Sequence, residues 1–233
     1  MPQYYSYDDG QRGGFLSNIP FVTRNILIVN VIFFVATMIN QNYMVKTFAM
    51  FYPASPFFNV WQILTYMFMH GGFWHIFANM WGLLMFGSAL ERTIGSRKYA
   101  TLYFMAGLGA LVLHTGIQFL QAMPLQEGIL AGDPVAQAKY QDIIRTPMVG
   151  ASGAIFGVQV AYAMLFPNDI WTLVFPPVSL KAKWFIAIFI GIELLTGVTG
   201  TMSGIAHFAH LGGALVGFLL LYWWRKSGKL WRS

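Results

Sequence analysis

Seven polar or ionisable side chains interrupt the apolar stretches of this sequence, and they are the candidates for chemistry. A serine hydroxyl becomes a nucleophile when a neighbouring base takes its proton, and histidine suits that role because it titrates near neutral pH. A serine and several histidines in apolar surroundings therefore predict acyl transfer. The seven side chains are His75, Asn79, His114, Ser152, Glu193, His207 and His210.

Acyl transfer also needs hydrogen-bond donors aimed at the oxyanion of its tetrahedral intermediate. His75 and Asn79 are four residues apart, so on a helix they share one face. The backbone N–H of Ser152, close to a predicted helix start, is a further donor with a favourable helix dipole. These three groups form the predicted oxyanion hole.

The composition indicates that these residues lie in a membrane. Of 233 residues, 57% are hydrophobic and 9% are charged, against roughly 25% charged residues in a soluble domain. The aromatic content of 17% excludes a disordered chain, and the absence of cysteine excludes thiol chemistry and disulfides. We expect the net charge of +6 to reflect membrane topology rather than nucleic-acid binding, and we expect no second, soluble domain.

Six segments are long and apolar enough to cross a bilayer, which takes about 20 residues. Six spans place both termini on one side, and eleven of the fourteen Lys and Arg residues fall on that side. The six apolar spans predict an all-α polytopic bundle. Because positive charge is in excess in cytoplasmic loops, the bias places both termini in the cytoplasm. The predicted spans are 24–41, 72–90, 99–120, 148–166, 184–201 and 203–224.

The predicted membrane domain, 24–224, follows a cytoplasmic segment, 1–23, and precedes a basic cytoplasmic tail, 225–233. Two long connections are expected on the outer side. Residues 44–70 are aromatic and contain prolines, which predicts an interfacial loop. Residues 121–147 are polar and are expected to be partly helical. The polar first segment lacks the apolar core of a signal peptide, so we expect the first helix to remain in the mature protein.

The candidate residues share one depth in this topology. Three of the predicted spans enter from the outer side, and each carries candidate residues in its first two turns. At 1.5 Å per residue these side chains lie about 5–12 Å below the outer surface. The residues are His75 and Asn79 on 72–90, Ser152 on 148–166, and His207 and His210 on 203–224.

Glycine spacing predicts that the helices carrying the serine and a histidine pack closely, because small residues four apart let two membrane helices approach. Two parallel helices with matched glycine faces would bring Ser152 and His210 together. His207 lies on a similar face and is therefore the competing base. It lacks glycines three and seven positions later, which favours His210. The glycines are Gly150, Gly153 and Gly157 around the serine, and Gly213 and Gly217 after the histidine.

Three motifs together resemble those of the rhomboid family, the six-helix intramembrane serine proteases. Each motif alone is common, but their combination on three predicted helices is specific. The resemblance covers most of the chain, from about Trp61 to Gly217. The motifs are HxxxxHxxxN from His70 to Asn79, GxSG from Gly150 to Gly153, and AHxxGxxxG from Ala209 to Gly217.

Some positions depart from the family pattern. Glu91 and Arg92 match the family's ExR pattern only in part, and we interpret the pair as a structural cluster at the cytoplasmic end. Gln62 follows Trp61 where many members have an arginine. Phe156 stands one turn after the serine, where a tyrosine often stacks on the catalytic histidine, and a phenylalanine can stack in the same way.

The resemblance implies a catalytic dyad in which Ser152 is the nucleophile and His210 is the general base. It also implies an oxyanion hole formed by the Ser152 N–H, His75 and Asn79. No acidic third member, cofactor or metal is expected, and Glu193 is expected near the middle of the membrane. Supporting positions are Gly150, Gly153, Phe156, Gly213 and Gly217.

The implied activity is cleavage of transmembrane segments of other membrane proteins near the outer face, through an acyl-enzyme. The expected partners are transmembrane protein substrates and the lipid bilayer, with no nucleic acid. The expected location is the inner, or plasma, membrane of a bacterium, as a multi-pass protein. Gate motion is expected in the fifth predicted span, 184–201, and near 202–206.

Three alternatives remain open. A rhomboid-like protein without catalytic activity would bind membrane helices without cutting them, although such relatives typically lack the serine or the histidine. A transporter would arrange its polar residues along a path rather than in one layer. Three histidines, His75, His207 and His210, could bind zinc, but no carboxylate is expected beside them to serve a metalloprotease mechanism.

Overall fold

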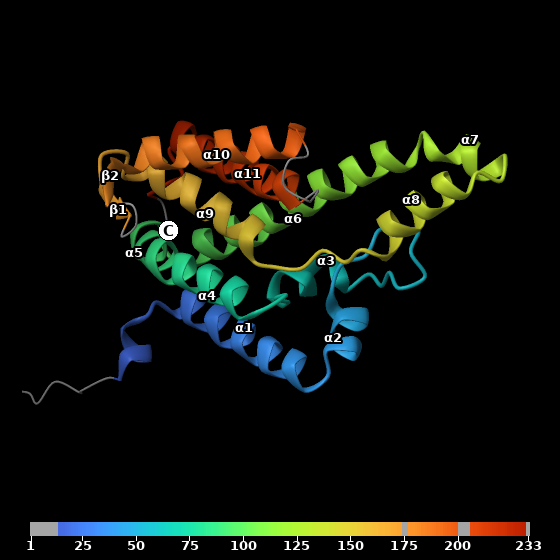
Figure 1. Cartoon of the computed structure of the whole chain (residues 1–233). Coiled ribbons are helices and arrows are strands. Elements are labelled where there is room, and N and C mark those ends of the chain that lie inside the picture. The colour runs from blue at the N-terminus through green and yellow to red at the C-terminus, as the bar shows by residue number, and fades with distance from the viewer. Residues whose placement is uncertain (1–13, 174–176, 200–205, 232–233) are drawn as a thin grey trace, which may run out of the picture.

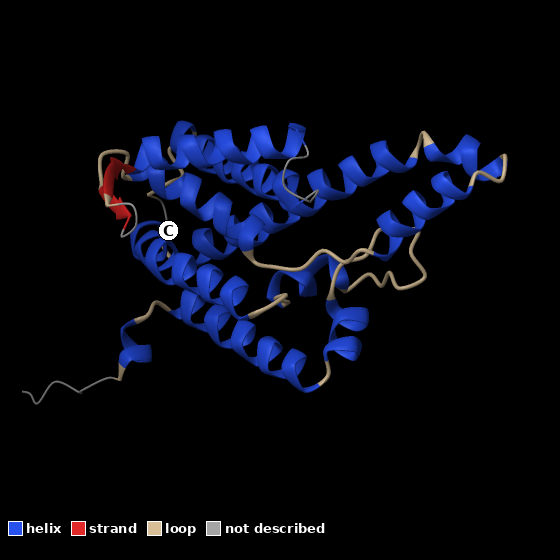
Figure 2. Ribbon diagram, in the orientation of Figure 1, coloured by secondary structure: helices blue, strands red, loops and turns tan. Residues whose placement is uncertain are grey.

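A computed structural model describes residues 14–173, 177–199 and 206–231, and it is built almost wholly from helices (Figures 1 and 2). Among these residues, five helices are long and apolar enough to cross a membrane. The predicted all-α polytopic membrane fold is therefore confirmed, while the cytoplasmic placement of the termini stays a prediction. The five are α1 (Phe21–Ile39), the continuous helix Phe73–Ile94, α6 (Ser96–Ala122), α10 (Ala182–Thr199) and α11 (Ala206–Lys226).

The second of these helices changes its winding partway along its length. It begins as α4 (Phe73–Gly82), passes through a π-helical segment (Leu83–Gly87) and continues as α5 (Ser88–Ile94). A π-helical turn is uncommon and often marks a functional region of a helix. Here it follows directly on the two turns that carry His75 and Asn79.

The fourth predicted span, 148–166, is shorter in the structure. The helix α9 (Ser152–Leu165) has 14 residues, so it is about 21 Å long at 1.5 Å per residue, against a hydrocarbon core of about 30 Å. Most of its side chains are buried, because α6 and α11 pack against it and against each other. The helix therefore starts inside the bundle, and the count of six spans stays a prediction.

The packing of α9 on α11 depends on glycine, as the spacing predicted. A Cβ atom built on Gly213 would overlap the carbonyl oxygen of Gly153. One built on Gly217 would overlap the backbone of Gly157. The two backbones are thus in direct contact, which is the close approach that small residues allow between membrane helices.

The segment 41–70 contains short helices rather than a spanning one. It consists of α2 (Gln41–Phe48), a connection, α3 (Gln62–Thr65) and a single 3-10 turn (Tyr66–Phe68). Its predicted interfacial position stays a prediction. A short 3-10 turn (Phe15–Asn18) also precedes α1.

Gln62, which follows Trp61, holds this segment together. Its side chain is fully buried. The amide nitrogen donates to the carbonyl oxygens of Phe57 (2.8 Å) and Lys46 (3.1 Å). The amide oxygen accepts from the backbone N–H groups of Asn59 (3.1 Å) and Phe51 (3.4 Å). A neutral amide, which both donates and accepts, thus anchors the loop from inside.

Glu91 forms a second polar cluster, in the α5 half of the second helix. Its carboxylate accepts the backbone N–H groups of Val22 (2.9 Å) and Thr23 (2.8 Å) in the first turn of α1. It also accepts the hydroxyls of Thr23 (2.8 Å) and Ser96 (2.6 Å), and Arg92 donates to the carbonyl of Asn18. A carboxylate is well placed there, because the first N–H groups of a helix lack partners of their own.

The remaining elements connect the spans. The connection 121–147 is mostly helical, with α7 (Leu125–Leu130) and α8 (Pro134–Arg145), and these helices project with the far end of α6 beyond the other helices (Figure 1). A two-stranded antiparallel hairpin, β1 (Ile170–Leu173) and β2 (Val178–Lys181), joins α9 to α10, with Ile170 opposite Lys181. These strands appear in red in Figure 2.

The first prediction concerns the α9–α11 contact. Gly213→Ala places a methyl group against the carbonyl of Gly153, and overpacking of this kind costs about 1–3 kcal/mol. We expect a lower midpoint of thermal unfolding in detergent, followed by tryptophan fluorescence. Gly116→Ala is the control, because a Cβ there meets open space. Equal midpoints for Gly213→Ala and the wild type would contradict the packing described.

The second prediction concerns the loop anchor. Gln62→Met keeps the side-chain length but removes its hydrogen bonds, and each buried backbone group left without a partner costs about 1–3 kcal/mol. We expect the thermal midpoint to fall. The same substitution at the exposed Gln126 is the control and should leave the midpoint unchanged. A Gln62→Met protein as stable as the control would show that the loop is held by its other contacts.

Candidate active site

Ser152 and His210 lie in contact, as the glycine spacing predicted. The serine is the first residue of α9, and the histidine stands in the second turn of α11. Serine Oγ lies 2.8 Å from Nε2 of His210, which is hydrogen-bond distance. This is the distance required between a serine nucleophile and its base.

The serine is held in place by the segment that precedes it. Met148 and Met50 exchange backbone hydrogen bonds of 2.8 and 3.0 Å, which ties this segment to the segment 41–70. The N–H of Gly150 donates to the carbonyl of Tyr66 at 3.0 Å. Gly150 itself has a φ of +124°, a backbone conformation that residues with a side chain rarely adopt. A glycine is therefore needed where the chain turns into α9. The Gln62-anchored segment therefore fixes where the helix begins.

Phe156 fixes the plane of the histidine ring. Its ring stacks on the imidazole of His210, with ring centroids 4.4 Å apart and an angle of 4° between the planes. It stands one turn after the serine, on the same face of α9. The stacking predicted from the sequence is present and needs no tyrosine hydroxyl.

His75 presents a donor towards the serine. The backbone N–H of Gly71 donates to Nδ1 of His75 at 3.3 Å, so in the neutral ring the proton resides on Nε2. The Nε2 edge lies against Gly150, where an added Cβ would come within 2.9 Å of it and 3.6 Å of Oγ of Ser152. The ring is therefore set to donate beside the serine.

Asn79 and His70 complete this wall of the site. Asn79 is buried, and its amide donates to the carbonyl of His75 at 2.9 Å, which leaves a second amide hydrogen for the pocket. The ring of His70 packs on that of His75 with centroids 5.0 Å apart. Burial and the neighbouring His75 lower the pKa of His70 to about 4, so His70 is neutral near pH 7. We interpret His70 as structural.

The predicted catalytic and oxyanion-hole residues line one cavity of about 260 Å³. Gln159 also lines it, although the sequence analysis did not select this residue. Gln159 follows Ser152 by seven positions, which is two helical turns, so its spacing could have placed it on the same face. The lining residues are His75, Ala78, Asn79, Ser152, Ile155, Phe156, Gln159 and His210.

The prediction that no acidic side chain reaches this layer is wrong. Oε2 of Glu193 lies 3.1 Å from Nδ1 of His210 and 2.6 Å from Nδ1 of His207. Glu193 is six residues from the last residue of α10, or about 9 Å along the axis. α9 begins at Ser152, four residues later than the predicted span, so the position of the serine cannot be counted from the predicted span end. The carboxylate on α10 and both histidines on α11 are in contact.

His207, the competing base, faces away from the serine. Its Nδ1 contacts Glu193 and also lies 3.2 Å from the hydroxyl of Thr196 on α10. The ring in hydrogen-bond contact with Ser152 is that of His210. His114 is buried on α6 and does not line the cavity.

The described residues contain no group of three histidine, aspartate or glutamate side chains arranged to hold a metal ion. The three histidines of the zinc alternative are therefore not brought together as ligands in this part of the chain. The expected gate near 202–206 lies almost wholly outside the described residues. Gly197 is within α10 and packs near His207.

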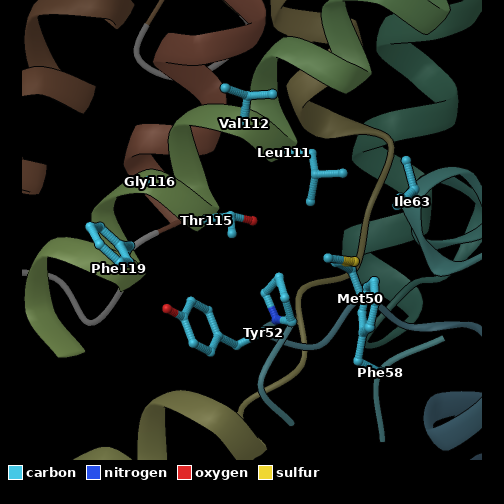
Figure 3. A pocket seen from close by; sticks show the side chains of 10 residues that line it. Met50, Tyr52, Phe58, Ile63, Leu111, Val112, Thr115, Gly116 and Phe119 are labelled. Atoms are coloured by element: carbon cyan, nitrogen blue, oxygen red, sulfur yellow. The ribbon is translucent and has the colours of Figure 1, made fainter. Parts of the chain in front are cut away.

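A second, larger cavity of about 600 Å³ lies between α6 and the segment 50–63 (Figure 3). None of its ten lining residues is acidic, basic or a histidine, so it offers no base for catalysis. The hydroxyls of Thr115 and Tyr52 are its polar side-chain groups, and the other side chains labelled in Figure 3 are apolar. Of these two cavities, the one at Ser152 is the one that holds a serine beside a histidine.

The fold and the site define a polytopic membrane protein with a serine and a histidine paired among its helices. A family profile described as the Rhomboid domain matches residues 57–227. The chain belongs to the rhomboid family.

Curated relatives agree with this assignment. "RHOMBOID-like protein 12, mitochondrial" of Arabidopsis thaliana is 30% identical over 200 residues, which cover 84% of this chain and 56% of that protein. "Rhomboid protease AarA" of Providencia stuartii is 27% identical over 167 residues, covering 69% and 54%. "RHOMBOID-like protein 4" of Arabidopsis thaliana is 30% identical over 161 residues, covering 69% and 33%. The chain thus spans between a third and somewhat over half of the length of these relatives.

The third prediction tests the turn before the serine. Gly150→Ala adds a methyl group in contact with the His75 ring, in a backbone conformation that alanine rarely adopts. We expect the reaction of Ser152 with a fluorophosphonate probe to slow by about tenfold or more, because a displacement of about 1 Å at a reactive site is costly. Gly72→Ala is the control, since a Cβ there meets open space. Unchanged labelling of Gly150→Ala would contradict the described wall.

Proposed function

We propose that this protein is an intramembrane serine endopeptidase that cleaves transmembrane segments of other membrane proteins. The proposal depends on one observation above all, the 2.8 Å contact between Oγ of Ser152 and Nε2 of His210 between two membrane helices. A serine hydroxyl in that position can carry out acyl transfer, because its base, His210, is held in place by stacking on Phe156. Membership of the rhomboid family and the relative named a rhomboid protease support the same activity.

The first half of the reaction forms an acyl-enzyme. Oγ of Ser152 attacks the scissile carbonyl carbon, and its proton moves to Nε2 of His210. The carbonyl oxygen becomes an oxyanion, which would accept hydrogen bonds from the Ser152 N–H and the side chains of His75 and Asn79. The intermediate then collapses, the C–N bond breaks, and the imidazolium returns the proton to the leaving amine.

The second half needs water. A water molecule gives a proton to Nε2 of His210 and attacks the acyl carbon, and the ester bond to Oγ breaks as the proton returns to Ser152. The short helix α9 supports this step, because its first residue is Ser152, which lies beside a cavity lined by the polar side chains of His75, Asn79 and Gln159. Water is available only if that cavity opens to the outer side.

The substrate must also change its structure. In a membrane helix every backbone carbonyl is hydrogen-bonded within the helix, so the scissile carbonyl has to be released before Oγ can attack it. Glycine and proline weaken a helix, so substrates with these residues near a small residue at the cut are expected to react best. The expected location is the inner membrane of a bacterium, with cleavage near its outer face.

A protein without catalytic activity that binds membrane helices is the second candidate. The features that oppose it are the serine and the histidine, which are both present and in contact. A zinc site is opposed by the contacts that its histidines already make: Nδ1 of both His207 and His210 lies against Glu193, and Nε2 of His210 lies against Ser152. Activity that persists in a chelator would dismiss a zinc mechanism.

The fourth prediction tests the dyad without a known substrate. In detergent or bilayers, we expect a fluorophosphonate probe to label the wild type, Ser152→Ala to abolish labelling, and His210→Ala to slow it by about 100-fold, the usual weight of a general base. His207→Ala is the comparison for the base and should label faster than His210→Ala. Labelled sites are identified by mass spectrometry of the digested protein.

Two results would overturn the proposal. One is a folded wild type that neither reacts with several such probes nor cleaves single-span membrane proteins in proteoliposomes. The other is cleavage that survives in Ser152→Ala. The first result would favour the binding protein, and the second would point to a different nucleophile.

A further inference from the structure

We propose that Glu193 is a positioning residue that completes a Ser152–His210–Glu193 triad within the membrane. The inference rests on the proposed function and goes beyond the two-residue dyad that the motifs imply. Its basis is the contact of one carboxylate oxygen, Oε2, with Nδ1 of His210 at 3.1 Å, on the side of the ring opposite Ser152.

The contact determines which ring nitrogen can act as a base. A neutral imidazole carries one proton, and a carboxylate attracts the N–H of the nearer nitrogen. The approach is an ion-pair distance rather than an aligned hydrogen bond, since Oε2 is hydrogen-bonded to His207 and Nδ1 of His210 has no hydrogen-bond partner among the described residues. The negative charge of Glu193 favours the proton on Nδ1, and Nε2 then has a free lone pair facing Oγ of Ser152. The opposite arrangement would leave Nε2 protonated and unable to accept the serine proton. In serine proteases an aspartate performs this orienting role.

The carboxylate also stabilises the charge that forms during the reaction. When the serine proton moves to Nε2, His210 becomes a cation, and Glu193 is the negative group beside it. The two side chains are 20% and 15% exposed, so water screens the pair less than it would screen a surface pair. Proton transfer from Ser152 to His210 is therefore easier with Glu193 in place than without it.

Other contacts hold the carboxylate and the ring in this arrangement. His207 Nδ1 lies 2.6 Å from the same Oε2, which prevents the carboxylate from turning away. Thr196 Oγ1 lies 3.2 Å from that Nδ1, and it also donates to the carbonyl of Ile192 at 2.8 Å. Phe156 covers one face of the His210 ring. His75 on α4 is the further titratable group that lines the site.

The two histidines on α11 consequently have different roles. They are three residues apart, so they share one face of the helix and both reach the carboxylate on α10. His210 continues to Ser152, whereas His207 ends the chain of contacts at Thr196. Each of the two histidines thus has its own contact, although only His210 contacts the nucleophile.

The fifth prediction compares Glu193→Gln, which removes the charge at constant size, with Glu193→Asp and the wild type. The probe is a fluorophosphonate, with the protein in lipid vesicles. We expect Glu193→Gln to lower the maximal rate of labelling by about tenfold or more while changing the half-saturating probe concentration by less than about twofold. Glu193→Asp should recover part of the rate. Gly191→Ala, on the same helix with open space around it, is the control.

The pH profile separates positioning from mere structural support. Loss of the negative charge makes the imidazolium less stable, so Glu193→Gln should remain reactive to lower pH, and its acid limb should move in that direction. A structural defect would lower the whole profile without moving this limb. Full labelling rate and an unmoved limb in Glu193→Gln would overturn the inference.

A measurement on the wild type keeps the inference testable if the variants do not fold. The ¹⁵N resonances of the histidines in lipid vesicles show which ring nitrogen carries the proton, and His210 is assigned by its absence in His210→Ala. We expect the proton on Nδ1 at a pH where the ring is neutral. A proton on Nε2 would overturn the triad. A wild type that reacts with no probe contradicts the proposed function instead, so the two failures are distinct.

Discussion

The structure depends on the close contact of two helix backbones at glycine. Gly153 and Gly157 on α9 meet Gly213 and Gly217 on α11, with no side chain between them. In a bilayer such packing supplies much of the attraction between helices, because the lipid is as apolar as the side chains it would replace. The same contact puts the first turn of α9 beside the second turn of α11. Stability and the serine–histidine pair thus come from a single interface.

A second constraint is that polar groups in the membrane domain need partners. Gln62 satisfies four backbone groups of the segment 41–70, and Glu91 satisfies the first N–H groups of α1. Each of these side chains belongs to one element and supplies hydrogen-bond partners to backbone groups of another. The Gln62 cluster supports the site directly. The segment that it anchors contains Met50, which exchanges backbone hydrogen bonds with Met148, and the Tyr66 carbonyl, which accepts from Gly150, and these contacts hold the turn before Ser152.

The candidate site was predictable from the sequence to the extent that it depends on local spacing. His75 and Asn79, four residues apart, lie on one wall, and the glycines around Ser152 and after His210 do pack together. The role of Gln62 could not be predicted, because an amide reveals its partners only when the loop is folded around it. Glu193 was misplaced because its depth was counted from ideal span ends. The actual start of α9 and end of α10 are set by the packing of their neighbours.

The sequence by itself determined the class of protein and predicted the helices that carry the candidate residues and the approach of Ser152 to His210. It could do so because hydropathy and residue spacing along one helix are local properties. On a helix, the spacing of two residues sets whether their side chains lie on the same face. Only the tertiary structure decided that α9 begins at Ser152, that His207 turns to α10, and that Glu193 stands behind His210. These depend on the relative depth and tilt of separate helices, which result from the packing of all of them at once.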